Sequence, residues 1–139
     1  MLFYILEDKT IMNRVKQSGI GSQIRLDIYK IPKKNHDALV ETQNLFVETF
    51  RKHGCYYQSF QLSNDQKSEG FTSMSDTVSA NQDEEVWMDV EAYTDHTHMD
   101  NVISKVMEDE RALSTMKRFL DLLSPGFSPI RAEFRRLAG

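Results

Sequence analysis

The sequence predicts an α+β fold in which helices cover one face of an antiparallel sheet. Segments in which apolar and polar residues alternate, a pattern typical of strands, recur along the chain. Segments with apolar residues three or four positions apart, a pattern typical of helices, lie between them. The resulting order is β-α-β-loop-β-α-α-β, and split β-α-β units in this order form ferredoxin-like sheets.

Length and composition favour one cytoplasmic domain. The chain has 139 residues, of which 40% are hydrophobic and 27% charged, as in ordinary globular proteins. The net charge of -4 argues against generic binding to a phosphate backbone. The single cysteine, Cys55, fits a reducing compartment, and no apolar run approaches the roughly 20 residues that a membrane span requires. We expect an arm at residues 1–22, partly disordered or laid on a neighbouring surface, and a folded domain at 23–139.

A strand and a helix open the expected domain. Apolar and polar residues alternate along Gln23–Pro32, where the proline ends the strand. Asn35 can cap a helix that runs to His53, and Gly54 follows at the usual position of a C-terminal glycine. The expected buried stripe of this helix is Leu39, Thr42, Phe46, Thr49 and Phe50.

Two further strands flank a long polar segment. Cys55–Leu62 is aromatic and bounded by turn-forming residues, and Glu85–Tyr93 alternates regularly, so both are expected to be strands. Between them, Ser63–Glu84 is rich in Ser, Asn, Asp and Gln. Loops of this length are uncommon in compact domains and are often functional or mobile, so this one is a candidate lid. The alternative is a solvated insertion that is anchored by one or two apolar side chains.

The last third of the chain predicts two helical segments and a closing strand. Thr94 or Asp95 can cap the first helix. The SPGFSP segment ends the second helix, and Ile130–Leu137 then alternates as a strand. The expected buried stripes are Met99, Val102, Ile103, Val106 and Met107 in the first helix, and Leu113, Met116, Leu120 and Leu123 in the second.

Alternation gives the predicted sheet two unlike faces. One face is apolar and carries Ile24, Leu26, Ile28, Val86, Met88, Val90, Ile130, Ala132 and Phe134. The other face carries Arg25, Asp27, Tyr29, Trp87, Asp89, Glu91, Tyr93, Arg131, Glu133 and Arg135. Because the helix stripes need an apolar cover, we expect the helices on the apolar face. We expect a second copy to shelter the mixed face, giving a homodimer through the sheet in a dimeric α+β barrel. A lone sheet with that face open to solvent is the competing arrangement.

Several segments resemble one family. IYKIPKKNHDALVETQNLFVETFRKHG resembles the strand–Pro–helix–Gly opening of the uncharacterised DUF1428 family, which belongs to the dimeric α+β barrel superfamily. FTSMSDTVSANQDEEVWMDVEAY is similar to its long loop, acidic turn and strand, and SPGFSPIRAEFRRL is similar to its closing loop and strand. MEDER departs from the family pattern, since Glu110 stands where proline is usual. The likeness covers Gln23–Leu137. It implies the fold and a homodimer but no activity, because none is firmly assigned to the family.

The mixed face is the candidate site for a small-molecule ligand. Asp89 and Glu91 lie two apart on one strand, so their Cα atoms are about 6–7 Å apart. Paired carboxylates can perform acid–base chemistry when one raises the pKa of the other. The alternative is that arginines on adjacent strands neutralise both. The candidate ligand-binding residues are Arg25, Tyr29, Trp87, Asp89, Glu91, Tyr93 and Arg131.

Three functions fit this pattern, and the sequence does not decide between an enzyme and a binding protein. The first is a small-molecule-binding homodimer, such as a cofactor-independent oxygenase or isomerase. The second is a structural or regulatory dimer without a ligand. The third, an RNA-binding ferredoxin-like module, is disfavoured by the acidic charge and by Asp89 and Glu91 on the sheet face. No cofactor motif is present, and His96 and His98 point apart on a helix, so neither a cofactor nor a metal is expected.

Overall fold

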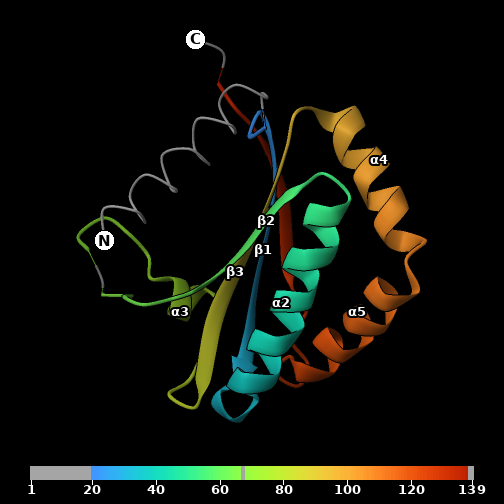
Figure 1. The fold of residues 1–139 in the computed structure, drawn as a ribbon. Coiled ribbons are helices and arrows are strands. Elements are labelled where there is room, and N and C mark those ends of the chain that lie inside the picture. Colours follow the sequence, from blue (N-terminus) through green and yellow to red (C-terminus); the bar gives the residue numbers. More distant parts are fainter. Residues whose placement is uncertain (1–19, 67, 138–139) are drawn as a thin grey trace, which may run out of the picture.

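A four-stranded antiparallel sheet forms the centre of the protein (Figure 1). The computed structural model describes residues 20–66 and 68–137, so most of the expected arm at 1–22 lies outside the described residues. The strand order is β2-β3-β1-β4. The strands are β1 (Gln23–Pro32), β2 (Tyr56–Gln61), β3 (Glu84–Tyr93) and β4 (Ile130–Arg135). The predicted ferredoxin-like α+β class is therefore confirmed.

Among the described residues, the longer helices lie on one side of this sheet and a short helix lies on the other (Figure 1). A 3-10 turn, η1 (Lys33–Asn35), leads into α2 (His36–Lys52), and α4 (His96–Met107) and α5 (Glu110–Leu122) follow β3. The short helix α3 (Met74–Thr77) interrupts the long polar segment. No helix among the described residues is both long enough and apolar enough to cross a membrane.

Helix α2 forms as predicted. Its expected stripe is buried along its whole length, and Gly54 follows the helix with φ +93°, a backbone conformation that glycine adopts without strain. Asn35 stands at the N-cap position but does not cap the helix with its side chain. Its amide instead donates to the Leu122 carbonyl at 3.0 Å, which ties the start of α2 to the end of α5.

Helices α4 and α5 begin at aspartate caps. Asp95 accepts from the His98 backbone N–H at 2.7 Å, and Asp109 accepts from that of Arg111 at 3.0 Å. In α4, Met99, Val102 and Val106 are buried as predicted, but Met107 is exposed.

The predicted stripe of α5 is wrong at two of its four positions. The buried residues are Ala112, Thr115 and Phe119, whereas Leu113 and Leu120 are exposed. Thr115 tolerates burial because its hydroxyl donates to the Arg111 carbonyl within the helix at 2.7 Å. Met116 and Leu123 of the predicted stripe are partly buried against the core, so the leucine spacing identified the helix and only part of the side that packs.

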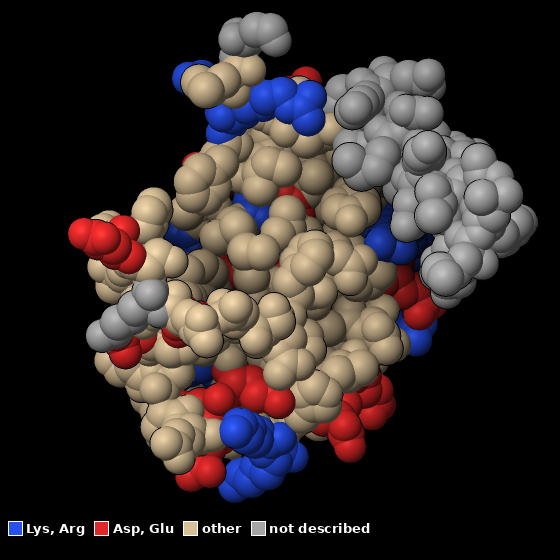
Figure 2. All heavy atoms as spheres, turned by 90° about the vertical axis from the view of Figure 1, so that its left-hand side faces the viewer, with Lys and Arg blue, Asp and Glu red and all other residues tan. Residues whose placement is uncertain are grey.

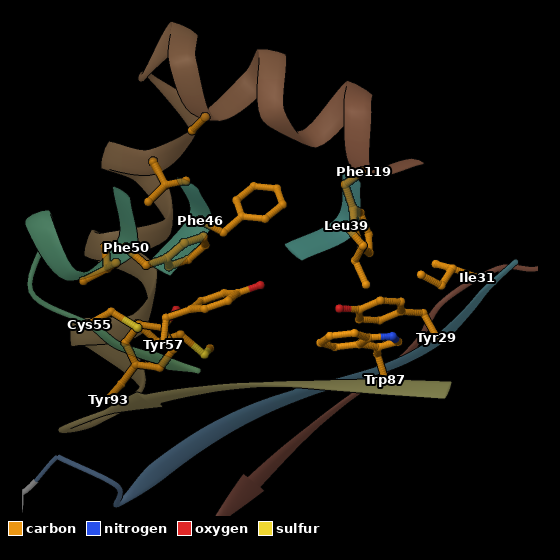
Figure 3. Close-up of a cluster of buried hydrophobic side chains, with 14 residues drawn as sticks. Tyr29, Ile31, Leu39, Phe46, Phe50, Cys55, Tyr57, Trp87, Tyr93 and Phe119 are labelled. Carbon is orange, nitrogen blue, oxygen red and sulfur yellow. The ribbon is translucent and has the colours of Figure 1, made fainter. Parts of the chain in front are cut away.

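The predicted assignment of the two sheet faces is also wrong. The mixed face lies under the helices, where Tyr29 and Tyr93 are fully buried (Figure 3). Its aromatic rings pack against α2 and α5; for example, Phe119 meets Tyr29 edge to face at 4.9 Å between ring centres. The rings supply the apolar contact that the helices need, while their polar tips find partners inside. The core residues are Tyr29, Ile31, Leu39, Phe46, Phe50, Cys55, Tyr57, Trp87, Tyr93, Met99, Val102, Val106, Ala112 and Phe119.

The apolar face is the one that α2, α4 and α5 leave open (Figure 1). Strand register places its residues in three rows across the sheet, none of them charged. Figure 2 looks onto this side and shows a broad uncharged surface with acidic and basic groups mainly around its margin. Phe60, Ile130 and Phe134 are among its most exposed side chains. The rows are Phe60, Met88, Ile28, Ile130; Gln58, Val90, Leu26, Ala132; and Tyr56, Ala92, Ile24, Phe134.

The orientation of α5 can be tested with two neighbouring residues. Phe119→Ala removes a buried ring and should lower the free energy of unfolding by about 3–5 kcal/mol. Leu120→Ala is the matched control, since Leu120 is 52% exposed, and it should change stability by less than about 1 kcal/mol. Urea unfolding monitored by circular dichroism measures both. A larger loss for Leu120→Ala than for Phe119→Ala would contradict the observed orientation.

Candidate functional site

Two rows of charged side chains cross the covered face of the sheet. Asp27 in β1 lies directly opposite Asp89 in β3 and Arg131 in β4. In the next row, Arg25 lies opposite Glu91 and Glu133. Alternation along the strands places both rows on the side that faces the helices. Burial of so many charges requires partners, and the partners differ from one carboxylate to the next.

Asp89 is held by neutral donors. It is 3% exposed. Its Oδ1 accepts from the Tyr29 hydroxyl at 2.8 Å, and its Oδ2 accepts from the Tyr57 hydroxyl at 2.6 Å and from Gln43 Nε2 at 2.5 Å. No ion pair to Asp89 is found among residues 20–66 and 68–137. Burial raises the pKa of Asp89, and the hydrogen bonds from Tyr57, Tyr29 and Gln43 only partly oppose it.

The two tyrosines remain hydrogen-bond donors to Asp89. Burial, followed by the nearby negative charge of Asp89, raises the pKa of Tyr29 and of Tyr57 well above the usual value. Gln43 Nε2 also lies 2.9 Å from the Tyr29 hydroxyl and 3.0 Å from Ser59 Oγ. Gln43 Oε1 is buried without a partner among the described residues. The hydrogen bonds to Asp89 therefore come from groups that carry no positive charge.

Glu91 lies in a different environment although it is two residues away. The Arg25 guanidinium holds both of its oxygens, with distances of 2.8–3.1 Å, and the Tyr93 hydroxyl donates to it at 2.5 Å. Burial raises the pKa of Glu91, while the charge and hydrogen bonds of Arg25 oppose the rise. Neutralisation by arginine, the alternative considered from the sequence, therefore applies to Glu91 and not to Asp89.

Asp27 and Arg131 form the second ion pair of the site. Arg131 Nε and Nη2 donate to the two carboxylate oxygens at 2.7 and 3.0 Å. The hydrogen bond with Asp27 raises the pKa of Arg131. Its side chain is 52% exposed, because the helices leave β4 largely uncovered.

A small cavity of about 30 Å³ lies among these groups. Its polar wall includes Arg25, Asp27, Asp89, Glu91 and Arg131, and its apolar wall comes from α2 and α5. A cavity of this volume holds about one or two water molecules. Arg131 is both a lining residue and half exposed, so it marks the side on which the cavity approaches solvent. The apolar lining residues are Phe46, Phe50, Met116 and Phe119, together with the ring of Tyr57.

The structure brings six of the seven predicted site residues together. Arg25, Asp89, Glu91 and Arg131 line the cavity, and Tyr29 and Tyr93 bind its carboxylates. Trp87 does not line the cavity, although it lies beside Tyr29, its partner across the β1–β3 pair (Figure 3). Its indole N–H donates to Glu85 at 3.1 Å, and its ring lies 5.8 Å from that of His36.

Sequence reasoning missed Gln43 and Tyr57 as members of the site. Gln43 sits within the buried stripe of α2, four residues after Leu39 and three before Phe46. A polar residue at such a position is a signal that a buried polar partner lies opposite. Tyr57 carried no comparable signal, because the alternation of β2 did not show which of its faces points inward.

The long polar segment is not a lid over this cavity. Its helix α3 lies on the opposite side of the sheet (Figure 1). The Asp65 carboxylate fixes α3 by accepting from the backbone N–H groups of Met74 and Ser75 at 2.8 and 2.7 Å. There α3 borders a separate apolar hollow of about 240 Å³ on the open face, beside Phe60, Met74 and Met88. The expected lid is therefore separated from Asp89 by the sheet itself.

The histidines near the start of α4 bind different partners. His96 lies 3.1 Å from Asp100 and 3.6 Å from Glu133, whereas His98 Nδ1 accepts from the Thr94 backbone N–H at 3.0 Å. Within the part of the chain that the structure describes, no three His, Cys, Asp or Glu side chains are arranged to hold a metal ion.

One protein family matches this sequence, and several solved structures have a similar fold. The profile of a family described as "Protein of unknown function (DUF1428)" matches residues 24–121. No curated protein matches the sequence significantly. A NIPSNAP family protein of unknown function from Agrobacterium tumefaciens has a similar structure, with a TM-score of 0.50 and 15% identity over 84% of this chain and 88% of that one.

Two further solved structures are similar. Rv0793 from Mycobacterium tuberculosis has a TM-score of 0.50 and 14% identity over 85% of this chain and 98% of that one. SnoaB, a cofactor-independent oxygenase from Streptomyces nogalater, has a TM-score of 0.47 and 11% identity over 86% and 97% of the two chains. At these identities the likenesses concern the fold alone.

The raised pKa of Asp89 predicts how stability depends on pH. The folded state binds a proton at Asp89 more tightly than the unfolded state does, so ionisation of Asp89 opposes folding. Wild-type stability should therefore fall, relative to Asp89→Asn, as pH rises from the unfolded pKa near 4 through the higher folded pKa. Urea unfolding of both proteins across this range measures the difference. A difference that stays constant with pH, or grows in favour of the wild type, would contradict the prediction.

Proposed function

Because this chain belongs to the DUF1428 family, whose members have no assigned activity, we propose that it is a homodimeric protein that binds a small organic molecule and transfers a proton to or from it at Asp89. Asp89 is the observation that carries the proposal. It is a buried carboxylate with a raised pKa, placed on the wall of a cavity. Such groups serve as general acids and bases, and perturbed carboxylates of this kind cluster at functional sites.

The groups around Asp89 support distinct roles. Glu91 and Asp27 each bind an arginine, so they supply fixed charge. Asp89 has no such partner among the described residues and is free to exchange a proton. Two carboxylates whose environments differ in this way are typical of acid–base sites. The hydroxyls of Tyr29 and Tyr57 hold the Asp89 carboxylate in place while it does so.

An isomerisation fits these groups better than an oxygenation. In an isomerisation, Asp89 donates a proton to one atom of the ligand and removes a proton from another, so no oxidant is consumed. An oxygenase would need dioxygen as a second substrate. The rings of Phe46, Phe50 and Phe119 suit a flat, partly apolar ligand, for which Met116 and Phe119 of α5 would have to move aside. A cytoplasmic location belongs to the same proposal.

A non-catalytic dimer is the second candidate. The core side chains, together with the pairs Arg25–Glu91 and Arg131–Asp27, leave a cavity of only about 30 Å³ at this site. A space closed by its own ion pairs is what a purely structural role requires.

Proton exchange with solvent distinguishes the two candidates. Wild-type protein is incubated in D₂O with a panel of enolisable ketones and phenols, and loss of proton signal from each compound is followed by NMR. We expect acceleration for at least one compound and a loss of about 100-fold or more in Asp89→Asn. Asp100→Asn on the surface of α4 is the control and should retain the wild-type rate. No acceleration across the panel, in protein that also carries no co-purified small molecule by mass spectrometry, supports the structural dimer.

The dimer itself is proposed through the open face and not through the mixed one. That face has three rows of uncharged residues, and exposed apolar surfaces of this kind mark sites of protein association. Two such sheets packed face to face would form a barrel with the helices outside.

A charged substitution on this face tests the proposed assembly. Phe134 is 54% exposed, so Phe134→Glu should leave the fold intact but place a charge inside the interface. Sedimentation velocity at micromolar concentration should show a dimer for the wild type and a monomer for Phe134→Glu. Phe71→Glu, at a residue that is 78% exposed and outside the rows, is the matched control and should remain a dimer. A monomeric wild type, or a dimeric Phe134→Glu variant, contradicts this interface.

A further inference from the structure

The Arg131–Asp27 pair occupies the solvent side of the Asp89 cavity. We propose that Arg131 recognises the acidic group of a ligand in competition with Asp27, and that its release from Asp27 makes Asp89 take up a proton. This inference rests on the proposed function of Asp89 and adds the substrate class, a small organic acid. Arg131 acts in it as a recognition and positioning residue, whereas the proton moves at Asp89.

Strand register provides the coupling between Arg131 and Asp89. Asp27 lies in the middle of one row, directly opposite Asp89 on one side and Arg131 on the other. Residues that face each other in this way have Cβ atoms about 4.5–5.5 Å apart, so the two aspartates are close neighbours. Two neighbouring carboxylates oppose each other's ionisation unless a cation balances one of them. Arg131 is the cation that balances Asp27.

Arg131 is the arginine of the site that a ligand can reach. Its side chain is 52% exposed, whereas that of Arg25 is 12% exposed and held by the buried Glu91. Asp27 engages two of the five N–H donors of the Arg131 guanidinium. The planar guanidinium matches a carboxylate with two parallel hydrogen bonds, which makes arginine suited to recognising acids.

Displacement of Arg131 changes the charge that Asp89 faces. Asp89 is faced by Tyr29 and Asp27 from β1, by Tyr57 and Ser59 from β2, and by Gln43 from α2. Among these groups, Asp27 carries a negative charge that Arg131 balances. When an acid draws Arg131 away, the negative charge of Asp27 acts on Asp89 without compensation. Asp89 then binds a proton from solvent and is ready to donate it to the ligand.

Carbon-13 NMR of the aspartate carboxyl groups measures the coupling without any turnover. The midpoint of the Asp89 titration is compared in the wild type, Arg131→Gln and Arg131→Lys. We expect Arg131→Gln to raise the midpoint by about one pH unit or more, and Arg131→Lys to restore part of the difference. Arg135→Gln is the control, since Arg135 is exposed on the same face of the same strand, and it should leave the midpoint unchanged. An unchanged or lowered midpoint in Arg131→Gln overturns the inference.

Benzoate and benzamide, which share a ring and differ in charge, test the recognition of an acid. Benzoate should raise the Asp89 midpoint in the wild type but not in Arg131→Gln, and benzamide should raise it in neither. No effect of benzoate at tens of millimolar, or an equal effect of benzamide, overturns the inference. The outcome is separate from that of the proton-exchange assay. Coupling without exchange would leave Arg131 as a sensor in a non-catalytic protein, whereas exchange without coupling would leave the proposed reaction standing.

Discussion

The structure depends on balancing the charges that lie on the covered side of the sheet. Arg25, Asp27, Asp89 and Glu91 all face the helices, and an uncompensated charge in such a place destabilises a protein by several kcal/mol. Two of the three carboxylates bind arginines, one from the neighbouring strand and one from the edge strand β4. The third, Asp89, is accommodated by hydroxyl and amide donors alone. The edge strand thus contributes little apolar burial to the core but completes its electrostatics.

This arrangement explains why a functional site and the core share one space. Tyr29 and Tyr57 belong to both the core and the site. Their rings pack against the helices, and their hydroxyls donate hydrogen bonds to Asp89. The rings therefore keep water away from Asp89, and the loss of water raises the pKa of that carboxyl. Packing and chemistry are two effects of the same side chains.

The order of elements and most of their boundaries could be predicted because periodicity, caps and glycines are local signals. Gln23–Pro32 and the stripe of α2 are examples. The inward face of the sheet could not be predicted in this way, because alternation shows that two faces differ but not which one is covered. The mixed face carries large aromatic rings that outweigh its charges once those are paired, and the pairs form between strands far apart in sequence. The same limit applies to α5, where leucines at regular spacing lie outside and Phe119 lies inside. For the site, residue type and strand position predicted the Arg25–Glu91 cluster, whereas the lack of an ion pair to Asp89 among the described residues depends on register.

The uncharged rows of the open face have a thermodynamic consequence. Association through such a surface is driven by the removal of apolar area from water, and this driving force weakens on cooling. Ionic strength has little influence on it, because screening acts on charges and the rows contain none. The affinity of any complex formed through these rows would therefore fall on cooling and change little with ionic strength.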